Sequence, residues 1–178
     1  NNINYPLTGK TFGVSILKRG LGIKEGVNLF SIDAAYNRYF NINKGWYGSV
    51  ELWSRIKLPF NQPYINRRAL GYGDLNLRGL EYYVIDGSVA SMAKFTVRKK
   101  IFDFKIPFPI KNKIVPYIPF SFYAKAFGDA GYVYSQQDAR AMLNNKLLYT
   151  GGVGLDVITL YDVTVRLDYS FNQLGEKG

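Results

Sequence analysis

The stretch VTVRLDYSFN, residues Val163 to Asn172, alternates apolar and polar residues without a break. Successive side chains of a β-strand point to opposite faces, so this pattern places the apolar side chains on one face and the polar side chains on the other. A helix would mix the two sets around its axis. The stretch therefore predicts a two-faced strand and indicates an all-β fold.

Six further segments alternate in the same way, and turn residues such as those of 41–45 separate them. Consecutive strands joined by short connections pair as antiparallel hairpins, so we expect one antiparallel sheet of about seven strands. No segment has helical periodicity and no shift in composition marks a domain boundary, so residues 1–178 are interpreted as one unit. The six segments are 10–16, 27–40, 46–58, 88–100, 118–134 and 147–159.

The composition narrows the chemistry that this chain can perform. It contains no Cys and no His, which excludes thiolate catalysis, disulfides, zinc sites with nitrogen or sulfur ligands and histidine acid–base catalysis. Carboxylate or lysine chemistry stays open, but we expect no catalytic site, no metal and no cofactor. The formal net charge of +10 is compatible with anionic partners and equally with a solvated charged face.

Alternation alone does not say which face is the inner one. In a soluble sandwich the apolar face forms the core, whereas in a transmembrane barrel it meets lipid and the polar face lines the lumen. Three features favour the transmembrane barrel. The strands are long enough for a tilted bilayer crossing, aromatic residues gather at strand ends, and the polar face mixes both signs of charge with Gly and Ser. No apolar run approaches the roughly 20 residues of a membrane-spanning helix.

The segment at about 60–87 interrupts the alternating strands and has neither the period of a β-strand nor that of a helix. It contains the glycine-bearing run Arg68–Asp74 and the run Leu77–Tyr83, whose sequence is LRGLEYY. Loops longer than about 12 to 15 residues are usually functional or disordered, and the aromatic and aliphatic content here favours an ordered one. We therefore expect a loop that folds back onto the sheet.

The order of these motifs resembles the C-terminal half of the barrel in the BamA/TamA superfamily of outer-membrane insertases, the bacterial surface-antigen family. The resemblance rests on a Pro-x-x-Gly strand entry, three hairpin-linked strands, Leu77-Arg78-Gly79, a basic strand and the strand carrying Phe127–Gly131. It implies about seven strands of a barrel of about sixteen, with the other strands and any periplasmic domains outside this chain.

The resemblance also implies a site. Arg78 and Gly79 would belong to the loop that folds into the lumen, and Asp129, inward by the alternation of its strand, would receive the arginine. Leu80 stands where the family usually has Phe or Tyr, so Tyr82 or Tyr83 is expected to supply the packing under the loop.

Other inward charges surround this expected pair. The basic strand at 88–100 carries cations at positions where relatives have a second acidic partner for the loop arginine. A second carboxylate for Arg78 would therefore have to come from another strand. Asp156 and Asp168 are interpreted as inward charges beside Arg166. The inward cations of the basic strand are Lys94, Arg98 and Lys100, and the carboxylates considered as second acid are Glu51 and Asp33.

The function implied by the resemblance is insertion, assembly or translocation of proteins at the bacterial outer membrane. Its partners would be outer-membrane lipid and lipopolysaccharide, client β-barrel proteins, and periplasmic or lipoprotein accessory subunits, with no nucleic acid. An alternative is a passive outer-membrane channel, or a barrel that anchors a fused surface or periplasmic enzyme. A third hypothesis is a soluble protein that binds lipid or nucleic acid through its basic face.

Overall fold

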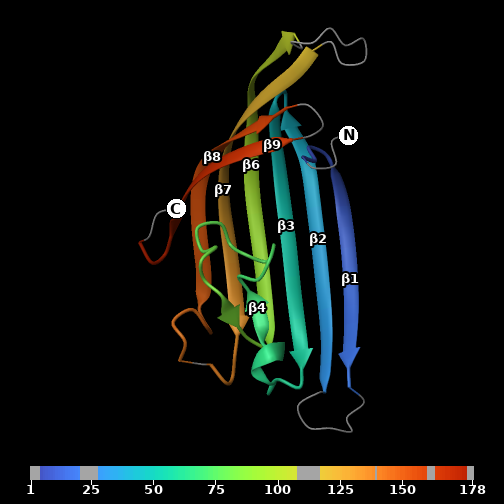
Figure 1. Cartoon of the computed structure of the whole chain (residues 1–178), viewed down its shortest axis with the longest axis vertical. Helices are drawn as coiled ribbons and strands as arrows, with labels where there is room; N and C mark the ends of the chain where they lie inside the picture. Colours follow the sequence, from blue (N-terminus) through green and yellow to red (C-terminus); the bar gives the residue numbers. More distant parts are fainter. Residues whose placement is uncertain (1–4, 21–27, 108–116, 139, 160–162, 176–178) are drawn as a thin grey trace.

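The computed structural model describes residues 5–20, 28–107, 117–138, 140–159 and 163–175. Seven long strands form one antiparallel sheet in the order β1-β2-β3-β6-β7-β8-β9, each paired with its neighbours along the chain (Figure 1). The strands are β1 Gly9–Arg19, β2 Leu29–Asn43, β3 Trp46–Leu58, β6 Val89–Pro107, β7 Tyr117–Tyr134, β8 Leu147–Ile158 and β9 Thr164–Asn172. The all-β class and the seven expected strands are confirmed.

The sheet formed by this chain is open, with β1 and β9 at its two edges. The structure thus has an antiparallel sheet of seven strands and not a closed barrel. Both edge strands are exposed along most of their length. Among the described residues, no helix is long and apolar enough to cross a membrane.

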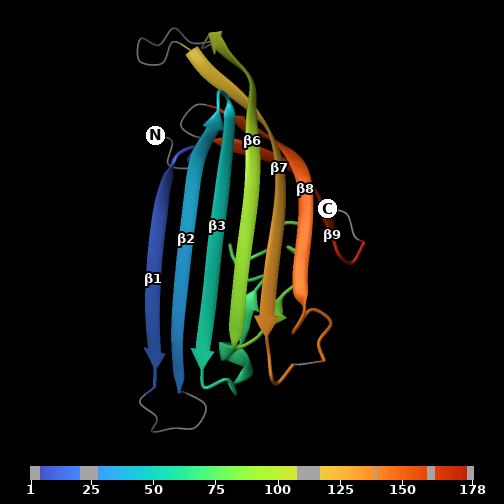
Figure 2. The ribbon, with the colours of Figure 1, turned by 180° about the vertical axis from the view of Figure 1, so that it is seen from behind.

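The β6–β7 hairpin extends well beyond the other strands (Figures 1 and 2). The expected alternation follows this strand to Lys100, but β6 continues to Pro107. An irregularity in the pairing between Lys100 and Phe102 changes which residues share a face, and therefore ends the pattern that the sequence shows. Beyond it, the rings of Phe102 and Phe122 stack across the two strands with centroids 4.5 Å apart.

The loop of residues 60–87, here called the folded-back loop, lies against one face of the sheet in front of β6 and β7 (Figure 1). It contains one 3-10 turn, η1 (Tyr64–Asn66), and a small antiparallel pair formed by β4 (Arg68–Leu70) and β5 (Ile85–Asp86). The expectation of no helix agrees with the described residues, whose one helical feature is the three-residue turn η1 after Pro63.

A small hydrophobic core fills the space between the folded-back loop and the sheet. The loop contributes aliphatic side chains, and β6, β7, β8 and the connection between β7 and β8 contribute the facing ones. This burial stabilises the loop in its place, since each fully buried aliphatic side chain contributes about 1.5 to 3 kcal/mol. The core residues are Ala69, Leu70, Leu77, Leu80, Ile85, Ala90, Met92, Val133, Leu143 and Leu148.

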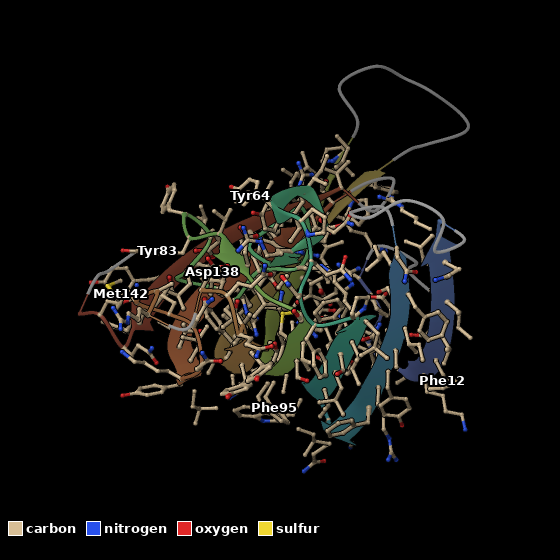
Figure 3. All side chains as sticks on the ribbon, turned by 90° about the horizontal axis from the view of Figure 1, so that it is seen from below. Phe12, Tyr64, Tyr83, Phe95, Asp138 and Met142 are labelled. Atoms are coloured by element: carbon tan, nitrogen blue, oxygen red, sulfur yellow. The ribbon has the colours of Figure 1, made fainter. Side chains whose placement is uncertain are left out.

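The two faces of the sheet differ sharply in chemistry. We call the face under the folded-back loop the inner face and the opposite one the outer face; in Figure 3, Phe95 and Tyr83 lie on opposite sides of the curved sheet. Apolar side chains cover the outer face and stay solvent-accessible, for example Phe12 at 73% and Val153 at 55%. The inner face buries polar and charged side chains instead, including Lys125 and Asp156.

Near its C-terminal edge the sheet curls strongly, and β8 and β9 bend across the end of the other strands (Figures 1 and 2). Glycines on β8 make the close approach possible. A Cβ at Gly152 would lie 2.4 Å from the carbonyl oxygen of Tyr169 and 2.6 Å from the ring of Phe127. A side chain at Gly152 therefore has no space, and the curl brings β9 toward the inner face.

Candidate functional site

The two charged side chains named from the sequence lie against each other on the inner face. Arg78 donates from Nε to Asp129 Oδ2 at 2.9 Å and from Nη2 to Oδ1, and its backbone N–H donates to Oδ2 at 3.0 Å. The rest of the guanidinium donates to Thr96 Oγ1 and to the carbonyl of Phe95, and it lies 4.0 Å from the ring centre of Phe127. Arg78 and Asp129 therefore form a bidentate ion pair, in which the Asp129 side chain is fully buried and most N–H groups of the guanidinium have an acceptor.

Gly79 allows the loop to approach the sheet at this point. Its φ of +87° is a backbone conformation that favours glycine, and a Cβ would lie 3.0 Å from Ser170 Oγ. Its carbonyl accepts a hydrogen bond from Asn172 Nδ2 at 2.8 Å, and its N–H donates to Glu81 Oε2 at 2.8 Å. The Arg-Gly dipeptide therefore ties the folded-back loop to β7 through the arginine and to β9 through the glycine.

The three residues expected to support the loop behave differently. Leu80 is buried at 3% exposure and belongs to the core, and Tyr83 packs against that core. Tyr82 is 95% exposed, so of the two tyrosines expected to pack under the loop only Tyr83 does so. Two consecutive turns, Leu80 N–H to the carbonyl of Leu77 and Tyr83 N–H to the carbonyl of Leu80, direct the intervening Tyr82 away from the sheet.

The second carboxylate considered for Arg78 is not supplied by Asp33 or Glu51 in the described structure. Asp33 lies opposite Arg55 on the neighbouring strand and forms an ion pair with it. Glu51 accepts a long hydrogen bond of 3.5 Å from the Tyr39 hydroxyl. A hydroxyl and a backbone carbonyl therefore complete the hydrogen bonding of Arg78.

A second buried cluster centres on Lys125 of β7. Its Nζ lies 2.6 Å from Asp156 Oδ1 and 2.7 Å from Asp168 Oδ1, and the lysine side chain is only 4% exposed. Arg166, suggested from the sequence as the neighbour of these carboxylates, does lie opposite Asp156 on β9, but the short ion pairs of both carboxylates are with Lys125. The glycine at 154 explains this, because a Cβ there would lie 2.8 Å from Lys125 Cε. Lys125 thus lies across β8 where a larger residue would block it.

The segment before β1 reaches into the same cluster. Tyr5 is buried, and its hydroxyl donates to Asp156 Oδ2 at 2.7 Å although the two residues are 151 positions apart. Its ring packs on that of Tyr123 with centroids 5.3 Å apart, and the guanidinium of Arg98 lies 5.0 Å from its ring centre. Burial, helped by the hydrogen bond to Asp156, raises the pKa of the Tyr5 hydroxyl, so the phenol keeps the proton that it donates.

Sequence reasoning missed Tyr5, because the residues before Gly9 show only a strand entry. A single tyrosine outside any alternating segment carries no signal of a long-range contact. The structure uses Tyr5 to connect the start of the first edge strand to β8, near the other edge of the sheet.

The base of the folded-back loop has its own polar anchors. The buried Nζ of Lys57 donates to the carbonyls of Asn66, at 2.7 Å, and of Arg68. Arg67 Nη1 forms an ion pair with Asp138 Oδ2 at 2.5 Å, which joins the loop to the connection between β7 and β8. In Figure 3, Asp138 lies on the loop side of the sheet. The loop is thus held at its base as well as at Arg78.

The arrangement is suited to holding a loop in place. Arginine and lysine pair with buried carboxylates, and the surrounding donors are hydroxyls and amides. Among the described residues, no group of three or more carboxylates is placed to hold a metal ion.

The fold and this site define a curved antiparallel sheet with an apolar outer face and a polar inner face covered by a loop. No protein-family model, characterised protein or solved structure matches the chain.

Proposed function

We propose that this chain forms part of the wall of a transmembrane β-barrel in the bacterial outer membrane, and that the barrel inserts or translocates other outer-membrane proteins. The observation that carries the proposal is the distribution of side chains over the two faces. Large apolar residues cover the uncovered outer face, whereas charged residues are buried under the folded-back loop. Lipid is the environment that suits such an outer face, and a closed lumen suits such an inner one.

In this proposal the folded-back loop is a rigid internal support, and no bond is made or broken. Arg78 and Asp129 hold the loop against β7, while Gly79 and Asn172 hold it against β9. The strands outside this chain would close the barrel. A client protein would pair with an edge strand of the barrel by β-augmentation, and the support keeps the wall in shape while that edge opens.

Reconstitution of the intact protein in liposomes tests the insertase function. The rate at which an unfolded client β-barrel protein folds into these liposomes is compared with the rate in empty liposomes. We expect the protein to accelerate folding and Arg78→Ala to reduce the acceleration. A folded, inserted wild-type protein that gives no acceleration would contradict the insertase function and leave the membrane location standing.

A second candidate is a barrel that only anchors a fused enzyme or conducts small solutes. The extent of the folded-back loop favours an anchor over a wide channel, because the loop and its core occupy the inner face along β6 to β8. Conductance across a planar bilayer separates the two possibilities. An anchor would show little current, and a channel would show stable open steps.

The membrane location itself predicts a depth-dependent penalty on the outer face. Val153 lies near the middle of β8 and is 55% exposed, so an arginine there costs little in water. In a bilayer we expect Val153→Arg to lower the free energy of unfolding by about 2 to 4 kcal/mol. The measurement is a denaturant titration in liposomes.

Tyr82→Arg is the matched control for Val153→Arg. Tyr82 lies on the folded-back loop and is 95% exposed, so the same new charge should leave the stability unchanged. Equal and small effects of the two substitutions would contradict the membrane-facing assignment of the outer face.

A further inference from the structure

A polar cavity of about 440 Å³ lies between the folded-back loop, the segment that carries Tyr5 and the inner face of the sheet. The loop, the segment and five strands (β2, β3, β6, β7 and β9) each contribute to its walls, so it depends on the complete fold. Five of the side chains that line the cavity carry a positive charge. These are Arg78, Lys94, Arg98, Lys125 and Arg166.

Two of these five cations form short ion pairs with carboxylates, and Arg98 forms a long one in which Nε lies 3.9 Å from Asp156 Oδ2. Arg78 is paired with Asp129, and Lys125 lies between Asp156 and Asp168. Lys94 and Arg166, by contrast, form no ion pair within 4 Å with any residue that the structure describes. The cavity therefore contains cations that the described part of the chain leaves available.

Arg98 is the most informative of the remaining cations. Its side chain is 14% exposed, and its Nη1 donates to Ser49 Oγ at 3.2 Å. Its Nε is buried and has no hydrogen-bond acceptor among the described residues. The nearest carboxylate oxygen, Asp156 Oδ2, is 3.9 Å away and already accepts from Tyr5. The buried Nε is not accessible to a ligand, so a ligand oxygen would contact Arg98 through the part of the guanidinium that lines the cavity.

We propose that this cavity binds a phosphate group, with Arg98 as the principal contact and Lys94 and Arg166 as supporting cations. Guanidinium and phosphate match in geometry, because the planar fork donates two parallel hydrogen bonds to two oxygens. The cavity volume falls within the range of about 300 to 1,000 Å³ that is usual for small-ligand sites.

The other walls of the cavity refine the ligand class. Glu51, Asp74 and Asp168 also line it; Asp168 is paired with Lys125, and the carboxylates of Glu51 and Asp74 accept hydrogen bonds but repel a fully charged anion. This combination fits a protonated phosphate, or a phosphate monoester whose hydroxyl groups face the two carboxylates. The inference does not depend on the proposed membrane function, since it concerns only the inner face.

Isothermal titration calorimetry of the intact protein in detergent tests the site, with inorganic phosphate and glycerol 3-phosphate as separate probes. Sodium chloride at the same ionic strength is the reference. We expect saturable binding of at least one probe, and tighter binding of glycerol 3-phosphate would identify a phosphate monoester as the ligand. Absence of saturable binding of both probes to the folded wild-type protein would overturn the proposal.

The variants separate a built site from general charge attraction. Arg98→Gln is expected to weaken binding by about tenfold or more, because it removes a charge-assisted contact. Arg166→Gln changes an exposed side chain of β9 and is expected to weaken binding severalfold without risk to the fold. Arg38→Gln removes an exposed cation away from the cavity and should change nothing. Equal weakening in Arg38→Gln and Arg166→Gln would overturn the proposal.

Discussion

Arg78→Ala is expected to lower the free energy of unfolding by about 3 to 5 kcal/mol, because it leaves a buried carboxylate without its partner. The Asp129 side chain is fully buried and takes three hydrogen bonds from Arg78. The backbone N–H of residue 78 remains in the variant, so part of the interaction persists. The loss should release the middle of the folded-back loop while its base stays anchored through Lys57.

Two measurements check this prediction, a denaturant titration and the rate of proteolysis within residues 60–87. Asp129→Ala removes the buried carboxylate itself. The double variant with Arg78→Ala should therefore lower the free energy of unfolding by less than the sum of the two single variants. Arg68→Ala is the control, because Arg68 is an exposed arginine of the same loop. Wild-type protease resistance of the loop in Arg78→Ala would contradict its role as the anchor.

Lys125→Met is expected to have an effect of similar size, about 3 to 5 kcal/mol, for the same physical reason. Lys125 is the cation between two carboxylates, and Asp156 is only 1% exposed. Without the lysine, the two carboxylates repel each other and the buried carboxylate of Asp156 loses its short ion pair. The curl that brings β9 toward the inner face should therefore loosen.

The double variant Lys125→Met with Asp156→Asn tests this reasoning. Removing the buried negative charge should restore part of the stability, because no uncompensated ion remains. Lys105→Met serves as control, since Lys105 lies on the exposed extension of the β6–β7 hairpin. Equal destabilisation by Lys125→Met and Lys105→Met, measured by denaturant titration, would contradict the importance of the cluster.

Much of the fold follows from a local property of the sequence. In a strand, side-chain direction repeats every two residues, so alternation alone indicated the seven strands and which residues share a face. Asp129 was predicted to point inward on this basis. The prediction is less complete for β6, where the irregularity after Lys100 interrupts the period.

The candidate site was predictable only in part. The resemblance predicted that Arg78 pairs with the inward Asp129, and the structure contains this ion pair. The choice between Tyr82 and Tyr83 stayed open because the loop has no period from which the direction of a side chain could be predicted, and the structure places Tyr83 against the core. The ion pairs of Lys125 with Asp156 and Asp168 were not predicted.

The sequence by itself determined the strands, their antiparallel connection and the polar and apolar sides of each, because these depend on neighbouring residues. Only the tertiary structure decided which cation meets which carboxylate, that Tyr5 reaches Asp156, and that a polar cavity remains beside Arg98. These contacts depend on the curl of the sheet at Gly152 and on distances between segments far apart in the chain. The alternation of side chains along a strand carries no information on the distances between remote segments. The packing of the whole chain therefore determines these distances.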